Sequence, residues 1–400
     1  MDPMRKGQRW ILDAFIGQGG FDVLHPEAAA ALEEFGYNST DFKRVFSRVK
    51  STSQMAAAWS SVAAELESRA HYWKSRGART AAVGLYERAA VLYGRTHYSF
   101  YGEDPRRMRY LDKLIKTFQE VIELSAHAVN RVVLPFEGKL LHGLFEYNQD
   151  AIKQPCVICL PGMDMFKEDW HAVMRERILP RGWTGFSMDG PGQGESLTRG
   201  LKLTIDNYDR ALSVVIDWLV QQPQVDPQRI VIIGSSMGSW WGARAAAVEP
   251  RIKAVSGNMA FLGDKQVDTA QPSFLANLSF MTGISDVEAL HRFISEMSLT
   301  NIVPNVKVPY LIVAGENDEL TSLESTVAIY KRFGGAKELW VYEGEFHPLG
   351  PTTAEWLDAS LDWLGQAMEG GIAPNHERQL FITKAGQYIE GSGEPSWWHP

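Results

Sequence analysis

The stretch Val231-Ile232-Ile233-Gly234-Ser235-Ser236-Met237-Gly238 decides the fold of this 400-residue chain. In it an apolar, β-branched run (Ile230 to Ile233) meets a small-residue, helix-forming run (Gly242 to Val248) through a Gly-x-Ser-x-Gly turn. A strand-turn-helix of this kind strains the backbone at the serine and lifts its hydroxyl clear of the sheet. N–H groups at the start of the helix can then bind developing negative charge. The sequence therefore predicts a nucleophile elbow with Ser236 as the nucleophile.

The composition indicates a globular protein with a large core, since 45% of the residues are hydrophobic. The net charge is -8, and acidic and basic residues are mixed along the chain. This argues against nucleic acid or an anionic membrane as a partner and favours a small-molecule substrate. The first residues, Met1 to Lys6, lead into a segment with no long apolar run. We therefore expect neither a signal peptide nor a spanning helix, and a cytoplasmic protein.

The two cysteines, Cys156 and Cys159, form a C-x-x-C pair that on spacing alone suggests a redox or zinc site. They lie in an apolar run, and residues three apart on a strand point to opposite faces of a sheet. We interpret them as buried, inert thiols, and we expect neither a metal nor a cofactor.

The first 128 residues predict an all-helical domain, because apolar residues recur there at spacings of three and four. The helices are expected over residues 26–35, 54–74, 79–96 and 105–124. One of them resembles an arm of a helical hairpin repeat, but there is no second copy at a fixed period, so a solenoid is not supported.

Residues 129–369 predict an α/β domain, since the period changes to alternation in a hairpin around Pro135-Phe136-Glu137-Gly138. Strands and helices then alternate, which predicts a mostly parallel, doubly wound sheet covered on both faces. The strands are expected at 156–160, 184–188, 230–233, 254–257, 310–314 and 338–342, with helices at 168–179, 206–221, 323–333 and 353–368. Residues 261–304 read as a helical insert after strand 6. Residues 370–400 read as a C-terminal tail that is poorly ordered or packs on another domain or subunit.

A serine hydroxyl needs a base to take its proton and an acid to orient that base, and in this kind of sheet both lie beyond later strands. His347 is the one histidine in a loop beyond a late strand, so it is the expected general base. Asp318 is the expected acid, with Glu316 and Glu319 as alternatives. The expected oxyanion donors are the N–H groups of Met237 and Met163.

The segment Asp189-Gly190-Pro191-Gly192-Gln193-Gly194-Glu195-Ser196 resembles a phosphate loop only superficially. No Gly-Lys-Ser/Thr follows it, and it contains no G-x-G-x-x-G. We interpret it as a wide turn after a strand.

With Ser236, Asp318 and His347 in this order, residues 130–368 resemble the α/β-hydrolase superfamily. Pro161-Gly162-Met163-Asp164, Lys167-Glu168, the Asp-Gly-Pro-Gly-Gln-Gly-Glu turn and the helical start resemble the branch that contains 2,6-dihydroxypseudooxynicotine hydrolase. Fermentation-respiration switch esterases and polyketide-shortening hydrolases are similar in layout. The resemblance implies a substrate cleft between the helical domain and the sheet, a homodimer, and hydrolysis of a carbon-carbon bond in a β-diketone or aryl ketone.

Cleavage of a carbon-carbon bond needs help for a carbanion leaving group, whereas an ester needs less. The candidate groups are Asp164, Lys167, Asp264 and Asp268. Trp240 follows the elbow closely enough to wall a pocket, and Gly162 permits a tight backbone. Tryptophans and other aromatic residues in both domains favour an aromatic or polyketide-like ligand.

The sequence thus predicts a cofactor-independent serine hydrolase that cleaves a ketone or ester through an acyl-enzyme. Three alternatives stay open. One is an acyltransferase or cyclase on the same triad, the second a small-molecule receptor on a hydrolase scaffold, and the third a scaffold that uses its helices for protein partners.

Overall fold

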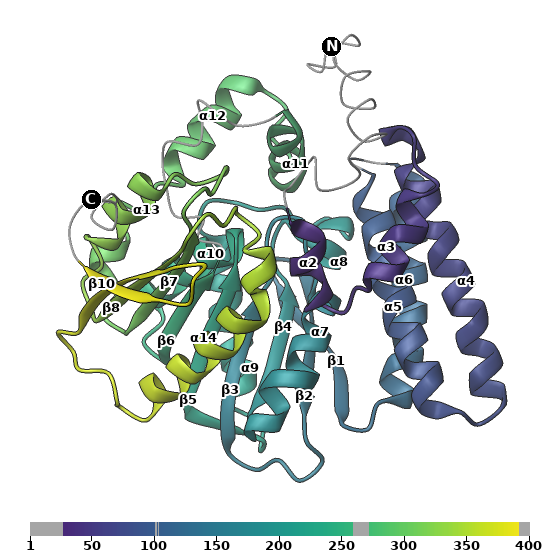
Figure 1. Ribbon diagram of the computed structural model, residues 1–400, viewed down its shortest axis with the longest axis horizontal. Coiled ribbons are helices and arrows are strands. Elements are labelled where there is room, and N and C mark those ends of the chain that lie inside the picture. The colour runs from purple at the N-terminus through teal and green to yellow at the C-terminus, as the bar shows by residue number, and fades with distance from the viewer. Residues whose placement is uncertain (1–26, 101, 103, 259–271, 392–400) are drawn as a thin grey trace.

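The computed structural model describes residues 27–100, 102, 104–258 and 272–391. Its centre is a sheet whose ten described strands run in the order β1-β2-β4-β3-β5-β6-β7-β8-β9-β10 (Figure 1). The strands are β1 (Ala128–Phe136), β2 (Lys139–Tyr147), β3 (Gln154–Leu160), β4 (Thr184–Asp189), β5 (Val225–Ser235), β6 (Ile252–Asn258), β7 (Tyr310–Gly315), β8 (Lys337–Tyr342), β9 (Glu377–Ile382) and β10 (Tyr388–Gly391). Neighbours from β4 to β9 pair in parallel, and β1, β2 and β10 pair antiparallel. The prediction of a mostly parallel sheet is therefore confirmed.

Five helices precede the sheet in the described part of the chain, and the three longest of them form a bundle beside β1 (Figure 1). They are α2 (Ala28–Glu33), α3 (Ser39–Phe46), α4 (Met55–Ser75), α5 (Arg79–Tyr98) and α6 (Pro105–Leu124), with a 3₁₀ turn η2 (Thr52–Gln54) before α4. Helix α3 was not among the helices predicted from the sequence. It is a short helix capped by the side chain of Asn38, which accepts the Thr40 N–H at 3.0 Å.

The remaining helices lie between or after strands. They are α8 (Gly194–Thr198), α9 (Asn207–Leu219), α10 (Met237–Val248), α11 (Pro272–Thr282), α12 (Val287–Glu296), α13 (Leu323–Tyr330) and α14 (Thr353–Met368), with 3₁₀ turns η7 (Val303–Asn305) and η8 (Gly350–Thr352). Helices α11 and α12 confirm a helical insert between β6 and β7, while its expected first part, residues 261–271, lies outside the described residues. The insert lies above the sheet in Figure 1.

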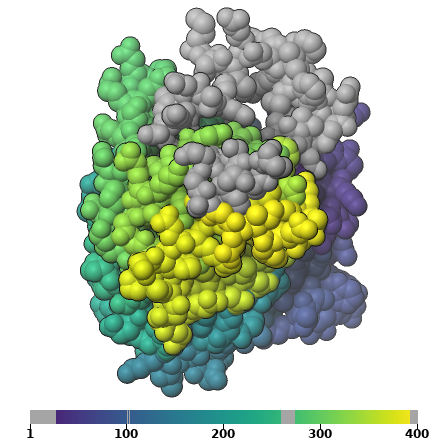
Figure 2. All heavy atoms as spheres, turned by 60° about the vertical axis from the view of Figure 1, so that its left-hand side comes forward, coloured from purple at the N-terminus to yellow at the C-terminus, as the bar shows by residue number. Residues whose placement is uncertain are grey.

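Three expectations were wrong in detail. The regular helix expected at 168–179 is instead a succession of short 3₁₀, α and π turns: η3 (Lys167–Trp170), α7 (His171–Val173), η4 (Met174–Ile178) and η5 (Leu179–Arg181). The turn expected at 189–196 already begins helix α8 at Gly194. The C-terminal tail, expected to be poorly ordered or to pack on another domain or subunit, forms β9 and β10 in its described part, and these strands extend the sheet and lie on the face shown in Figure 2 (yellow). Residues 392–400 lie outside the described residues.

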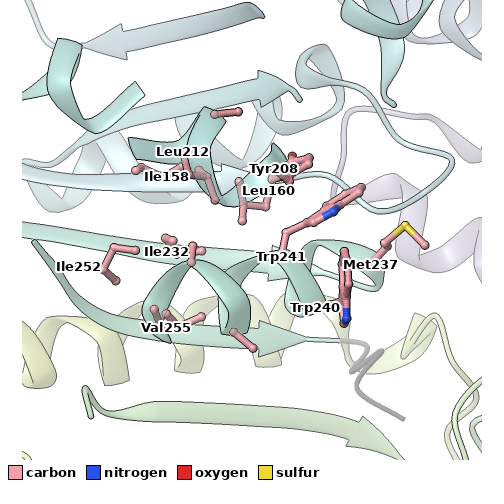
Figure 3. Packing of buried hydrophobic residues seen from close by; sticks show 14 of the residues in the cluster. Ile158, Leu160, Tyr208, Leu212, Ile232, Met237, Trp240, Trp241, Ile252 and Val255 are labelled. Carbon is pink, nitrogen blue, oxygen red and sulfur yellow. The ribbon is translucent and has the colours of Figure 1, made fainter. Parts of the chain in front are cut away.

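Hydrophobic residues fill both faces of the sheet. One cluster joins α9, α10, α12 and α13 to the first face, and part of it, with Ile158, Leu212 and Ile232 among its members, is seen in Figure 3. The other cluster joins α14 and the helical bundle to the second face. Cys156 belongs to the first cluster and Cys159 to the second, which confirms that the two buried thiols point to opposite faces. Burial raises the pKa of the Cys156 thiol to about 12. No helix in the described part of the chain could cross a membrane.

Candidate active site

Ser236 lies between the end of β5 and the start of α10, in the strained conformation that the elbow requires. Its φ is 53° and its ψ is -120°, a backbone conformation that residues other than glycine rarely adopt. The two flanking glycines make room for the turn. A Cβ on Gly234 would lie 2.4 Å from the Gly238 oxygen, and one on Gly238 would lie 2.2 Å from the Leu160 oxygen. The Ser236 N–H donates to the Asn258 carbonyl at 2.8 Å, which ties the elbow to β6.

The structure brings the three residues of the expected triad together, although Ser236 and His347 are far apart in the sequence. Nε2 of His347 lies 2.8 Å from Oγ of Ser236, and Nδ1 lies 2.8 Å from Oδ2 of Asp318. The other Asp318 oxygen accepts the N–H groups of Leu320 and Thr321 at 2.8 and 2.7 Å, so the carboxylate is fixed. The three side chains therefore form one hydrogen-bonded chain.

The two alternative acids have different partners. Oε2 of Glu319 accepts the His347 N–H at 2.9 Å, and Oε2 of Glu316 accepts the Gly344 N–H at 2.7 Å. Both carboxylates thus hold the backbone of the loop that carries His347, while Asp318 faces its ring. Glu316 and Glu319 are therefore positioned as supports for that loop.

His347 is buried, and burial by itself lowers the pKa of an imidazole. The Asp318 carboxylate acts in the opposite direction through its charge and its hydrogen bond, with a smaller contribution from Glu319, and the pKa of His347 is raised as a result. An imidazole with a raised pKa is a stronger base for the serine proton, provided that the pH keeps it neutral.

The loop after β3, residues Pro161 to Asp164, lies against the nucleophile. A Cβ on Gly162 would be 3.2 Å from Cβ of Ser236, so a larger residue would crowd the serine. Met237 is the first residue of α10, and the N–H groups of a first helical turn have no partner within the helix. The two expected oxyanion donors, Met163 and Met237, thus belong to segments that meet at Ser236.

Two residues of α5, Arg95 and Tyr98, hold the far end of this loop. Nη1 of Arg95 donates to the Asp164 carbonyl and to Oδ2 of Asp164, each at 3.1 Å. The Tyr98 hydroxyl donates to the Met163 carbonyl at 3.4 Å and accepts a hydrogen bond from the Asn277 amide of α11. The helical region and the insert therefore meet over the loop. Arg95 could not be predicted as a site residue, because nothing in the sequence of a regular helix indicates which distant loop its side chains will contact.

The other residues that were expected to contact the substrate differ in their burial and in their contacts. Lys167 is fully buried, with Nζ 2.9 Å from Asp189 and 3.1 Å from Glu195, so it stabilises the fold and does not face a ligand. Trp240 is also buried and donates from Nε1 to the Met297 carbonyl at 2.7 Å, which ties α10 to the end of the insert (Figure 3). The Asp164 side chain, at the end of this loop, is 58% exposed. Asp264 and Asp268 lie outside the described residues.

Among the described residues, one group has the spacing of a metal site: His127, Glu146 and His171, whose ligand atoms lie within 4.8 Å of one another. The atoms already pair with each other. His127 Nε2 lies 2.8 Å from Glu146 Oε2, and His171 Nδ1 lies 2.9 Å from Glu146 Oε1. The second nitrogen of His171 lies 3.3 Å from Glu87 of α5. We interpret this group as a buried ion pair between the helical bundle and the sheet.

A strained serine at a strand-helix turn, hydrogen-bonded to a histidine and an acid that follow later strands, defines the α/β-hydrolase class. Within this class, residues 57–301 match the model of the FrsA-like esterases. The match covers more than half of the chain, which therefore belongs to the FrsA-like esterase family.

Two curated relatives illustrate the family. The chain is 24% identical over 263 residues to the 2,6-dihydropseudooxynicotine hydrolase of Paenarthrobacter nicotinovorans, which covers 66% of this chain and 70% of that protein. It is 30% identical over 218 residues to 20-hydroxy-prefusarin hydrolase FUS2 of Gibberella moniliformis, where the match spans 49% of each protein. The crystal structure of the 2,6-dihydroxy-pseudo-oxynicotine hydrolase has the same fold, with a TM-score of 0.77 at 22% identity, over 87% of this chain and 98% of that one.

Proposed function

We propose that this protein hydrolyses a ketone or an ester of an aromatic or polyketide-like small molecule, with Ser236, His347 and Asp318 as its catalytic triad. The observation that carries the proposal is the pair of 2.8 Å contacts that place the His347 ring between the Ser236 hydroxyl and the Asp318 carboxylate. In such an arrangement the histidine accepts the serine proton while the carboxylate holds its tautomer and stabilises its charge.

The reaction has two halves. In acylation, Nε2 of His347 takes the hydroxyl proton as the Ser236 oxygen bonds to the carbonyl carbon, and the oxyanion that forms is bound by the N–H groups of Met163 and Met237. The bond to the leaving group then breaks, and the leaving oxygen or carbon takes the proton from Nε2. In deacylation, His347 removes a proton from water, the hydroxide attacks the acyl carbon, and the Ser236 oxygen recovers the proton as the acid departs.

The choice between ketone and ester depends on what stabilises the leaving group. Lys167 is excluded from this role because its ammonium is enclosed by carboxylates. The Tyr98 hydroxyl bonds to the loop beside Ser236 and accepts from the Asn277 amide, so we propose these two polar groups as contacts for a bound substrate. The names of the two relatives, which refer to a pseudooxynicotine and to a prefusarin, support an organic small molecule over a peptide or a sugar.

Labelling with a fluorophosphonate probe tests the nucleophile. We expect the wild-type protein and Ser235→Ala to be labelled and Ser236→Ala to be unlabelled, because Ser235 is a buried neighbour that does not contact His347. No labelling of the wild-type protein would contradict a serine hydrolase and favour a receptor. Products formed from benzoylacetone and from p-nitrophenyl butyrate in ¹⁸O-water then separate carbon-carbon cleavage from ester cleavage. Hydrolysis places the label in the acid, whereas cyclisation or transfer to another acceptor does not.

A further inference from the structure

The Gly-rich turn after β4 has a rigid framework that the triad alone does not explain. Oδ1 of Asp189 accepts the Lys167 N–H at 2.8 Å, and Oδ2 accepts the Glu195 N–H at 2.9 Å. A Cβ on Gly194 would lie 2.3 Å from the Asp189 carboxylate, and Gly194 and Gly192 both have a positive φ. The residue between these two glycines, Gln193, is 1% exposed. The turn therefore holds one polar side chain inside the protein.

The Gln193 amide uses both of its donors on the loop beside Ser236. Nε2 donates to the Pro161 carbonyl at 3.0 Å and to the Gly162 carbonyl at 2.9 Å. Oε1 accepts from the Tyr208 hydroxyl at 2.7 Å and from the Gly190 N–H at 3.3 Å. Because the Gly190 N–H can only donate and the two carbonyls can only accept, this network fixes which end of the amide is nitrogen.

The hydrogen bond from Gln193 to the Gly162 carbonyl also affects the Met163 N–H, because both groups belong to one peptide. The peptide bonds of the loop are trans, and in a trans peptide the C=O and the following N–H point in opposite directions. The Gly162 carbonyl and the Met163 N–H belong to the same peptide. A donor that holds the Gly162 carbonyl on one side therefore holds the Met163 N–H on the other side, where it is expected to bind the oxyanion.

We propose that Gln193 is the positioning residue of the oxyanion hole, because it sets the orientation of the peptide between Gly162 and Met163. The proposal rests on the serine-hydrolase function proposed above. It assigns a role to the Asp-Gly-Pro-Gly-Gln-Gly-Glu motif, whose glycines leave room for the turn and whose glutamine reaches the neighbouring loop.

The surroundings of Gln193 support such a role. Tyr208 of α9 stacks on Trp241 of α10, with ring centroids 4.0 Å apart and planes within 7° (Figure 3). A Cβ on Gly190 would lie 2.3 Å from the Tyr208 ring, so only glycine lets the tyrosine reach Gln193. The phenol that orients the amide is thus itself fixed against the helix that follows the nucleophile.

Three variants test the proposal. Gln193→Met keeps the length of the side chain and removes its hydrogen bonds. Tyr208→Phe removes only the hydroxyl that orients the amide. Gln379→Met makes the same change as the first variant at a buried glutamine of β9, six strands from β4 in the sheet, and serves as the matched control.

For each folded variant we would measure the rate constant of fluorophosphonate labelling, together with kcat, KM and the pH profile for p-nitrophenyl butyrate. Loss of one oxyanion donor lowers kcat by about 10²- to 10³-fold, so a misdirected donor in Gln193→Met is expected to lower kcat and the labelling rate by about 10- to 100-fold. We expect KM to change by less than about threefold and the midpoint of the pH profile to stay in place, because His347 and Asp318 are untouched. Tyr208→Phe is expected to lower kcat and the labelling rate by a smaller factor, and combining it with Gln193→Met should lower them little further than Gln193→Met alone. Gln379→Met is expected to lower neither.

The outcomes are distinguishable. A folded Gln193→Met variant that reacts at the wild-type rate, while Ser236→Ala is unlabelled, would overturn the positioning role and leave the hydrolase function intact. A parallel loss in Gln379→Met, or a shifted pH midpoint, would overturn it in favour of general destabilisation. If Gln193→Met does not fold, Tyr208→Phe decides, and a wild-type rate in that variant overturns the proposal. A wild-type protein that is not labelled removes the hydrolase function and this proposal with it.

Discussion

The ion pair between the helical bundle and the sheet makes the stability of the protein depend on pH in a definite direction. His171 is 3% exposed, and its two ring nitrogens face Glu146 and Glu87. Burial lowers the pKa of this histidine, but the two carboxylates more than offset that effect and raise it from 6.5 to about 10. The imidazolium therefore stabilises the folded state, and the change His171→Gln removes its charge while keeping a hydrogen-bond donor.

The size of the effect follows from the linkage between proton binding and folding. At about 1.4 kcal/mol for each pH unit, a shift from 6.5 to about 10 corresponds to about 5 kcal/mol. This contribution is complete below pH 6.5, where both the folded and the unfolded protein bind the proton. Above that pH the unfolded chain loses its proton first, so the contribution declines between pH 6.5 and about pH 10 and is absent above pH 10.

The assay is urea unfolding followed by tryptophan fluorescence at pH 6, 7, 8 and 9. We expect the difference in the free energy of unfolding between the wild-type protein and His171→Gln to be largest at pH 6. From about pH 6.5 it should shrink by about 1.4 kcal/mol for each pH unit. Glu87→Gln neutralises one of the two carboxylates, so in this background the His171 contribution should decline over a narrower pH range. A difference that is the same at all four pH values would refute the reasoning, since it would mean that folding does not raise the pKa of His171.

Two further changes have definite expected outcomes. Asp318→Asn should lower kcat on p-nitrophenyl butyrate by about 10³- to 10⁴-fold, and its rising pH limb should move to lower pH because the carboxylate that raises the pKa of His347 is gone; an unshifted limb would contradict this. Trp240→Phe should cost about 1 to 3 kcal/mol in urea unfolding, because it leaves the Met297 carbonyl without its 2.7 Å donor. Trp241→Phe is the matched control, since the Trp241 indole nitrogen has no hydrogen-bond partner among the described residues, and an equal cost in both variants would contradict a role for the hydrogen bond.

The sequence predicted those parts of the molecule that depend on local chemistry. The Gly-x-Ser-x-Gly turn fixes the geometry at Ser236 by sterics alone, and the parallel sheet requires Asp318 and His347 to follow later strands. The C-terminal strand β9 escaped prediction because its last four residues are all buried and do not alternate. Its position is set by parallel pairing with β8, from which helix α14 separates it in the sequence, and such long-range pairing is a tertiary effect.

The candidate site shows the same division. Lys167 lies near the site in sequence, but the carboxylates of Glu168, Asp189 and Glu195 enclose it, and only the fold reveals that they converge. Gln193 was hidden within a turn motif. The one signal available was a polar residue between two glycines, which is typical of a crowded backbone around a side chain that must turn inward.

The hydrogen bonds from Arg95 and Tyr98 to the loop beside the nucleophile limit how such a protein can be re-engineered and how it can diversify. The helical segment is more than a detachable cover, because its helix α5 itself holds the loop that carries Met163, an expected oxyanion donor. A chimera that exchanges this segment for that of a relative will also exchange the side chains that hold this loop. Turnover will survive the exchange only where the new side chains match the recipient loop.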